Sequence, residues 1–499
     1  MKPRSSTPRI ARPPARRMAA SGAALLTAAA LAGCVSGPAF VAPDRPTVAT
    51  YTASPASDLR AGTEPAQHLA YGHAPSADWW TLLASPELDR VVALALANNQ
   101  SLASARANLE RVSEQARAVQ GSLYPQVDAA ASLSREQYGA SFLGPQARTF
   151  PVFSAGSAGV TVSYDLDLFG GRTRSVELAK AQVEQQRQLV NAATLAVTGN
   201  VVVQAVQVAA ARSEIGVVED ILTADRKTLD LVQAAHSAGG VSDVDVLSAQ
   251  NQLDRDQTML PPLRQRLSAA EDALAVLVGK PTAQWMSPAF TLETLTLPGA
   301  VPVVVPSELV AARPDIRAAE AQMHAANAAV GVATANLYPH VNLSAAIAEQ
   351  GLVGGVGGPA GSLLGGLTAP ILDGGALKAR RRGAIDAYHA AAADYQQVVL
   401  ASFAQVADAL HALANDADAL SAEQRALASA DATLALTRAG YAAGSVGVVQ
   451  MLDAQRQSEQ AQQGQVRARA QRYQDTVRLF LAVGGGMGGA KAKTPPAAS

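Results

Sequence analysis

Apolar side chains recur at every seventh residue along two stretches of the chain. The first stretch carries Val201, Val208, Ile215, Leu222 and Leu229, and the second carries Val406, Leu413, Leu420, Leu427 and Leu434. A sustained seven-residue spacing keeps the apolar seam on one face of packed helices, so it predicts left-handed coiled-coil helices. We expect these helices over about 172–236 and 376–441, each roughly 65 residues and on the order of 100 Å long.

The second stretch repeats the first at an offset of 205 residues. The phrase SAGGVSDVDVLSAQ begins at Ser237 and the phrase AAGSVGVVQMLDAQ begins at Ala442, so that Gly239 aligns with Gly444. A single amphipathic core helix would drift toward a 3.6-residue period, and we therefore interpret the two tracks as an internal duplication. Each glycine marks the turn where one long helix reverses into the next.

Alternating apolar and small or polar residues precede each long helix. The alternation follows Tyr-Pro in GSLYPQVDAAASLS from Gly121 and in ANLYPHVNLSAAIA from Ala335, and it returns in AGVTVSYDLDLFGG from Ala158 and LLGGLTAPILDGG from Leu363. Period-two alternation is typical of strands with two different faces, so four strands are predicted. We expect the segment LVGGVGGPAGS, which precedes the last strand, to be a glycine-rich loop.

Each half therefore reads helix, strand, loop, strand, very long helix, turn and helix. The shorter helices are expected over about 87–121 and 243–278, and together they match the length of one long helix. The predicted fold class is mainly α with a small β part. We divide the chain into a signal peptide (1–33), an extended segment (34–85), a first repeat (86–280), a linker (281–312), a second repeat (313–483) and a disordered tail (484–499).

The first residues have the pattern of a secretion signal. Six basic residues precede an uncharged stretch that begins at Met18 and ends in LAGC at Cys34. This stretch is too short and too rich in alanine for a stable membrane span. Because LAGC resembles a bacterial lipobox, residues 1–33 are predicted to be removed and Cys34 to carry a covalent lipid. The alternative is a soluble secreted protein with one incidental cysteine.

Composition and charge narrow the function classes. Aromatic residues make up 4% and charged residues 16% of the chain, which favours long, closely approaching helices. Loss of the six basic leader residues changes the formal net charge from −1 to −7, which argues against nucleic acid as a partner. The seven histidines lack metal-ligand spacing and no phosphate-binding glycine loop occurs, so we expect neither an enzyme nor a cofactor other than the lipid.

The predicted strands raise the question of a membrane. No stretch after the leader holds roughly 18–20 uninterrupted apolar residues, so a membrane crossing would be made by strands. Four strands leave edges unpaired, and closed barrels begin near about eight strands, so an oligomer is implied. The alternation equally fits a half-buried soluble sheet, and the secretion and lipidation signals favour the membrane.

The mature chain resembles the TolC-type outer-membrane efflux proteins, in the lipoprotein (NodT-like) branch that serves resistance-nodulation-division pumps. The matching segments are LAGC, DWWTLLASPELDRVVALALANNQSL from Asp78, YDLDLFGGRTRS from Tyr164, VPSELVAARPDIRAAEAQ from Val305, APILDGG, both Leu-Tyr-Pro segments and both turn phrases. The resemblance implies a homotrimer in the outer membrane, with one twelve-stranded β-barrel and a periplasmic α-barrel tunnel of antiparallel coiled-coil helices. It also implies a periplasmic adaptor protein and an inner-membrane transporter as partners, and passive export of small molecules such as drugs.

The resemblance places a periplasmic gate at the two turns. The family has an aspartate six residues after the first turn glycine and a tyrosine three residues before the second, here Asp245 and Tyr441, which we expect to form a hydrogen-bonded latch. The family's ring acid is kept as Asp453, whereas Gln450 replaces a second acid. In a trimer this departure leaves a ring of three charges in place of six, and clustered carboxylates repel one another and favour cations.

Each gate residue also has a purely structural interpretation. Asp243 or Asp245 fits the start of a helix, where a carboxylate satisfies free amide groups. Tyr441 fits as a cover of the apolar seam, and Asp453 fits a solvated helix face. Two other functions also stay open, namely a type I protein-secretion duct of the same architecture and a lipid-anchored periplasmic coiled coil without a pore.

Overall fold

The computed structural model describes residues 36–55, 57–137 and 152–486. The chain divides into two compact units. Unit 1 comprises Met1–Val41, Val112–Val183 and Gln322–Ala391, and unit 2 comprises Ala42–Arg111, Glu184–Ala321 and Ala392–Ser499. The predicted signal peptide, the lipidation site Cys34 and residues 487–499 of the predicted tail lie outside the described residues.

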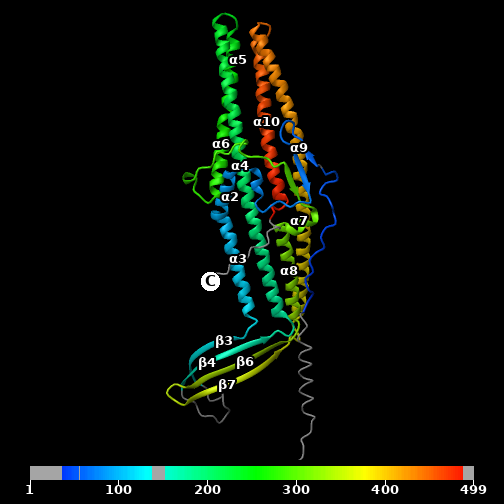
Figure 1. Ribbon diagram of the computed structural model, residues 1–499. Helices are drawn as coiled ribbons and strands as arrows, with labels where there is room; N and C mark the ends of the chain where they lie inside the picture. Colours follow the sequence, from blue (N-terminus) through cyan, green and yellow to red (C-terminus); the bar gives the residue numbers. More distant parts are fainter. Residues whose placement is uncertain (1–35, 56, 138–151, 487–499) are drawn as a thin grey trace, which may run out of the picture. The chain divides into compact units, whose positions relative to one another are not determined.

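Unit 1 contains a four-stranded antiparallel sheet (Figure 1). Its strands are β3 (Gln126–Glu136), β4 (Phe153–Leu166), β6 (His340–Leu352) and β7 (Gly357–Thr368), in the order β3-β4-β6-β7. Each repeat contributes one hairpin, and the hairpins join through β4 and β6, in register from Ala155 opposite Leu352 to Leu166 opposite Val341. The prediction of four strands is confirmed.

The loop between β6 and β7 is shorter than the sequence indicated. We expected a loop over the whole of LVGGVGGPAGS, but β7 already begins at Gly357, which pairs with Gly351. Glycine weakens a strand because it has no side chain to pack, yet its backbone N–H and C=O still pair when a regular strand lies alongside. The prediction was therefore wrong for Leu352, the last residue of β6, and for residues 357–362 of β7.

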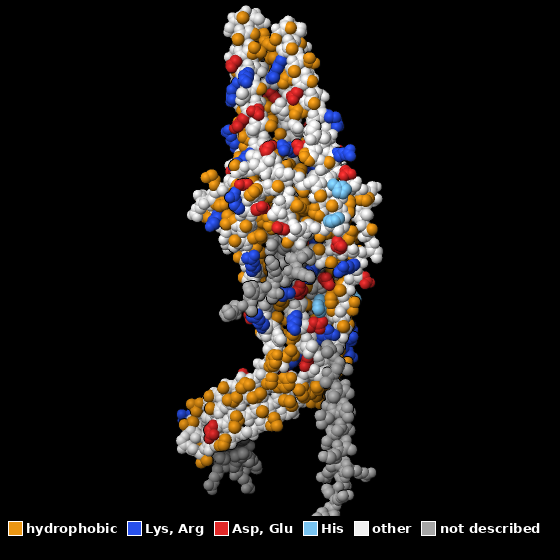
Figure 2. Space-filling view, viewed as in Figure 1, with side chains coloured by type: hydrophobic (Ala, Val, Ile, Leu, Met, Phe, Trp, Pro, Cys, Tyr) orange, Lys and Arg blue, Asp and Glu red, His pale blue; other side chains and the backbone are white. Residues whose placement is uncertain are grey.

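Apolar side chains gather over this sheet, because Figure 2 shows an orange patch at the place where Figure 1 labels the strands. Large exposed hydrophobic residues of the strands are Val127, Leu133, Val160, Val162, Leu343, Ile347, Leu352, Leu363, Leu364 and Leu367. Leu363 alone is 83% exposed. A contiguous apolar surface of this kind requires lipid or another protein chain to cover it.

The two predicted long helices are α4 (Gly171–Ser237) and α9 (Ala376–Ala442), and both predictions are confirmed at 67 residues each. All their heptad residues are buried except Ile215 and Leu427, which are partly buried. By length and composition alone, each helix contains a window apolar enough to span a membrane. In α4, however, Val201 and Val208 are fully buried in the core of unit 2, so this composition reflects helix packing.

The remaining helices are α2 (Pro86–Asn98), α3 (Gln100–Gly121), α5 (Asp243–Gln257), α6 (Leu260–Leu277), α7 (Pro306–Ala312), α8 (Pro314–Ala335) and α10 (Val448–Ala482). The single helices expected over 87–121 and 243–278 are thus each split in two. Asn99 is extended, with ψ 124°, and its Oδ1 accepts a bond of 3.1 Å from the N–H of Leu102 to begin α3. Pro261 and Pro262 lack an N–H donor, and a helix tolerates this lack only in its first turn. A new helix, α6, therefore begins at Leu260 with both prolines in its first turn.

A small sheet joins the predicted extended segment to the predicted linker. Its strands are β1 (Asp58–Leu59), β2 (Gln67–Tyr71) and β5 (Ala300–Val303), with β2 and β5 parallel. Two short 3-10 helices lie nearby along the chain: η1 (Trp79–Leu83) follows β2, and η3 (Thr282–Gln284) precedes β5. Both segments therefore contain regular structure. In η1, Trp79 is fully buried and stacks on Phe480 of α10, with 5.1 Å between ring centroids.

Candidate functional site

The turns between α4 and α5 and between α9 and α10 depend on the two aligned glycines. Gly239 has φ +78° and Gly444 has φ +72°, in the left-handed region that other residues enter only with strain. In each turn, the N–H of the next residue donates 2.9 Å to the carbonyl five residues earlier and closes the long helix. A Cβ at either glycine would meet nothing within 4 Å, so backbone conformation and not space selects glycine.

The predicted gate acid Asp245 already has partners in its own turn. Its Oδ2 accepts bonds from the Ser242 N–H (2.9 Å) and from the Ser242 hydroxyl (2.7 Å), and the Ser242 hydroxyl accepts in return from the Asp245 N–H (3.4 Å). These bonds from Ser242 hold the pKa of the Asp245 carboxyl below its ordinary value. This capping box starts α5. Asp243 beside it is exposed, with its carboxylate 3.3 Å from Nε2 of His236.

Tyr441 packs against a cluster of buried apolar residues behind the turns, which we name the tip cluster. Its members are Val218, Leu222, Leu229, Val232, Ala249, Leu253, Leu263, Val448 and Met451. Throughout the described part of the chain, no partner of the Tyr441 hydroxyl is found within hydrogen-bond distance. In the single chain Asp245 and Tyr441 are thus not bonded to each other, and the latch stays a prediction.

The two predicted ring positions lie in the first turns of α10. Gln450 Oε1 accepts a bond of 3.3 Å from the N–H of Gly447, which has no side chain to return it. Asp453 pairs with Arg456 and also accepts a bond of 2.8 Å from Nε2 of Gln457. Its side chain is 47% exposed, so the carboxylate is accessible to water and to ions. The ring itself depends on other chains and stays a prediction.

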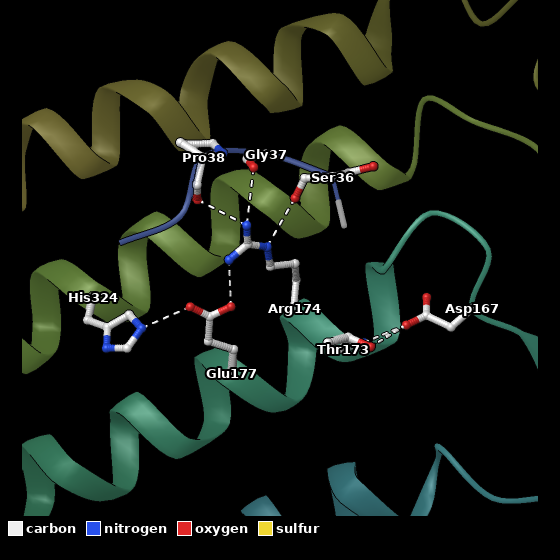
Figure 3. Close-up of polar contacts among 8 residues, drawn as sticks. All are labelled: Ser36, Gly37, Pro38, Asp167, Thr173, Arg174, Glu177 and His324. Atoms are coloured by element: carbon white, nitrogen blue, oxygen red, sulfur yellow. Dashed lines mark hydrogen bonds and ion pairs between the residues drawn. The ribbon is translucent and has the colours of Figure 1, made fainter. Parts of the chain in front are cut away.

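A second site, which sequence reasoning missed, holds the N-terminal end of the described chain in unit 1 (Figure 3). The guanidinium of Arg174 donates through Nε to the carbonyl of Ser36 (3.0 Å) and through Nη2 to the carbonyls of Gly37 and Pro38 (3.1 Å each). Arg174 is only 6% exposed. A buried guanidinium needs such a full set of acceptors, so these carbonyls fix the path of the backbone.

Two further side chains complete this N-terminal clamp. Glu177 accepts a bond of 2.6 Å from Nη1 of Arg174 and lies 2.9 Å from Nε2 of His324, whose ring stacks on Phe40 at 4.3 Å. Burial raises the pKa of Glu177, but the bonds from His324 and Arg174 outweigh it and hold this pKa below its ordinary value. At Gly37, φ is +86° and a Cβ would lie 2.7 Å from Cα of Gly331. Only glycine fits where the chain crosses α8.

The junction from β4 into α4 beside the clamp is also capped by a carboxylate. Asp167 accepts bonds from the N–H groups of Arg172 (2.9 Å) and Thr173 (2.8 Å). The second repeat uses Asp373 in the same way, with bonds from the N–H groups of Gly375 (2.9 Å) and Leu377 (2.7 Å). These bonds, led by that from Leu377, hold the pKa of Asp373 below its ordinary value. The duplication therefore extends to the caps of the two long helices.

Buried carboxylates form a third feature that the sequence analysis did not single out. Asp225, Asp256 and Glu459 are 2%, 3% and 6% exposed, and one oxygen of each lies within 4.8 Å of one oxygen of the others. Burial, with the charge of Asp256, raises the pKa of Asp225 to about 7, and burial, with the charge of Asp225, raises that of Glu459 to about 8. One signal was available, because Asp225 interrupts the apolar seam between the heptad residues Leu222 and Leu229.

The comparison with known families decides the identity. A family model described as outer membrane efflux protein matches residues 91–280 and 305–485. The chain belongs to the outer membrane efflux protein family. The resemblance to TolC-type efflux proteins, noted from the sequence, is thereby confirmed.

Relatives of this efflux family match along nearly the whole chain. The pyoverdine export outer membrane protein OpmQ of Pseudomonas aeruginosa is 28% identical over 428 residues, which cover 84% of this chain and 90% of OpmQ. Nodulation protein T of Rhizobium leguminosarum bv. viciae is 28% identical over 480 residues and 94% of each chain. A solved structure of the outer-membrane channel OprN superposes with a TM-score of 0.82, at 25% identity, over 91% of this chain and 100% of OprN.

The family and the fold together give the general function. This efflux protein is an outer-membrane channel that extends into the periplasm and serves as an exit duct. Its family and fold are those of channels and not of enzymes. The mainly α fold with a small sheet, predicted from the sequence, is confirmed.

Proposed function

We propose that three copies of the chain close one twelve-stranded barrel, with β3 of each copy paired to β7 of the next. The observation that carries this proposal is the sheet of unit 1, in which neither β3 nor β7 has a partner strand on its outer edge among the described residues. Unpaired strand edges are unstable in water and in lipid alike, and an exposed apolar face is unstable in water. Closure into a barrel pairs the edges, and insertion into the membrane covers the apolar face with lipid. Four strands are too few to close without other copies.

The trimer acts as the exit duct of a tripartite efflux pump. A periplasmic adaptor protein docks at the turns, and an inner-membrane resistance-nodulation-division transporter supplies the energy. The names of two relatives support this role in a pump: OpmQ is named for pyoverdine export, and TtgI of Pseudomonas putida is named as the outer membrane protein of a toluene efflux pump. The cargo is therefore a small molecule, and its release through the duct is passive.

A lipid on Cys34 anchors each copy to the outer membrane. The N-terminal clamp supports this role, because Arg174 fixes the backbone from Ser36 to Pro38, two residues after Cys34 along the chain. Ser36 N–H also donates 3.1 Å to the carbonyl of Phe169, between β4 and α4. A chain held next to the end of a barrel strand keeps an attached lipid beside the membrane surface. Mass spectrometry of the mature protein tests this, and an unmodified Cys34 would contradict it.

The trimer is tested with a pair of glycine variants in β4, a strand that is paired on both edges within the chain. A Cβ at Gly159 would lie 2.4 Å from the Cβ of Ala348, whereas a Cβ at Gly156 would meet no atom closer than 3.7 Å. We expect wild type and Gly156→Val to run as unheated trimers in denaturing gels and to conduct ions in planar bilayers, and Gly159→Val to lose both properties. A monomeric wild type without conductance would instead support a coiled coil without a pore.

The cargo class is tested in a strain that lacks the gene. Complementation with wild type should restore tolerance to small toxic molecules. Restored secretion of a polypeptide, with no change in tolerance, would favour the type I secretion duct.

A further inference from the structure

We propose that Asp225, Asp256 and Glu459 bind a divalent cation, with Ca²⁺ as the best fit, and that the ion joins α4, α5 and α10 behind the turns. The three carboxylates come from three different helices of unit 2, and each is more than nine-tenths buried within the single chain. No arginine, lysine or histidine of the described residues forms an ion pair with any of them. Buried carboxylates without a basic partner require protons or a cation.

The distances between the carboxylates suit calcium. One oxygen of each carboxylate lies within 4.8 Å of one oxygen of each of the others. A point therefore exists no more than about 2.8 Å from all three oxygens, close to the roughly 2.3–2.6 Å of Ca²⁺–oxygen bonds. Mg²⁺ needs about 2.0–2.1 Å and a near-ideal octahedron, so it fits less well. The ligands are all hard oxygens, which disfavours softer transition metals.

The hydrogen bonds around the cluster leave ligand positions open. Gln455 Nε2 donates 2.6 Å to Oδ1 of Asp225, and Gln252 Nε2 donates to Oδ2 of Asp256 (2.7 Å) and to Oε2 of Glu459 (3.2 Å). Each amide thus orients a carboxylate through one oxygen, as neighbours of metal ligands do. The other oxygens of Asp225 (Oδ2) and Glu459 (Oε1) are buried without any hydrogen-bond partner. Such unsatisfied oxygens are costly unless a ligand occupies them.

Access to the cluster is provided by a cavity of about 290 Å³. It is lined by Glu459 of the cluster, by Gln455 beside it, and by the exposed residues Asp220, Asp431 and Arg438. An ion can therefore reach the cluster from solvent without unfolding of the helices. This site goes beyond the proposed function, because it is complete within one chain and does not require the trimer.

The test is a calcium titration of the full-length protein in detergent after removal of bound ions with a chelator. All proteins carry Asp453→Asn, so that an ion at the predicted ring is excluded. We expect one Ca²⁺ per chain by calorimetry and a rise of several degrees in the unfolding midpoint. Asp225→Asn and Glu459→Gln should abolish both effects. The matched control Asp416→Asn, at a half-buried carboxylate beside the buried Asp475 elsewhere in unit 2, should leave them unchanged.

Two outcomes would overturn the site. The first is a stripped protein that shows no calcium response, which would mean that the carboxylates share protons instead. The second is a response that survives Asp225→Asn and Glu459→Gln. If either variant fails to fold, Thr228→Val gives an independent answer, because it removes only the 2.8 Å bond that orients Gln455. This variant should weaken Ca²⁺ binding by about tenfold, and unchanged affinity would count against the site.

Discussion

At the scale of single residues, the turn glycines have a role that space alone does not explain. Gly239 adopts a left-handed conformation with open space around its missing Cβ. Gly239→Ala should therefore destabilise the turn by about 1 kcal/mol through backbone strain. Gly216→Ala, inside α4 and also in open space, should stabilise by about as much because alanine favours helix. Thermal unfolding by circular dichroism checks the opposite signs, and two shifts in the same direction would contradict the assignment.

Another single residue makes stability depend on pH. Burial raises the pKa of Asp416 in α9 from 3.8 to about 7, and a bond and charge from Asp475 add to the rise. At a pH between these two pKa values, Asp416 keeps its proton in the folded chain and has lost it in the unfolded chain. The free energy of unfolding therefore falls as pH rises from about 4 to 7. Asp416→Asn should remove about 1–2 kcal/mol of that fall, after allowance for solvent screening.

Urea unfolding at several pH values measures the effect of Asp416. The exposed Asp418, two residues along the same helix, provides the control variant Asp418→Asn. If the free energy of unfolding of both variants depends on pH as it does in wild type, the protonation of buried Asp416 does not cause that dependence.

At the scale of elements, the N-terminal clamp is expected to keep the first described residues against α4 and α8. Arg174→Met removes four hydrogen bonds from a buried position, so the Ser36 N–H, which donates 3.1 Å to the carbonyl of Phe169, should lose its protection from hydrogen exchange. Arg187→Met, on the same helix but at an exposed pair with Glu184, should leave this protection unchanged. Equal protection in the two variants would show that the clamp does not hold the segment.

Some elements of the fold could be predicted from the sequence and others could not. The period-seven tracks predicted α4 and α9 because every heptad of a coiled coil, two helical turns, carries the same apolar signal. The breaks at Asn99 and before Pro261 were missed, since one cap or one proline outweighs an otherwise continuous helical pattern. The clamp and the buried carboxylates were also missed, because they join residues far apart in sequence. Arg174 reaches Ser36 and Asp225 meets Glu459 only in the folded chain.

At the scale of the whole molecule, duplication gives each chain two turns that are chemically different. The turn after α4 has a full capping box, from Ser242 and Asp245, whereas the turn after α9 has only the one-sided bond from Gly447 to Gln450. A full box satisfies two backbone donors and a one-sided cap satisfies one, so the first turn of α5 is more stable than the first turn of α10. In a trimer, opening at the periplasmic end is therefore expected to begin at the start of α10.

The latch prediction must be separated from this capping role. Tyr441→Phe removes only a hydroxyl that has no partner among the described residues of the chain and keeps the ring against the tip cluster. If that hydroxyl bonds to Asp245 when the channel is closed, Tyr441→Phe should raise single-channel conductance in planar bilayers. Ser242→Ala keeps the Asp245 carboxylate but weakens the cap by about 1 kcal/mol, so it should change stability more than conductance. Conductance that rises in Ser242→Ala but not in Tyr441→Phe would assign the closed state to the capping box and remove the latch.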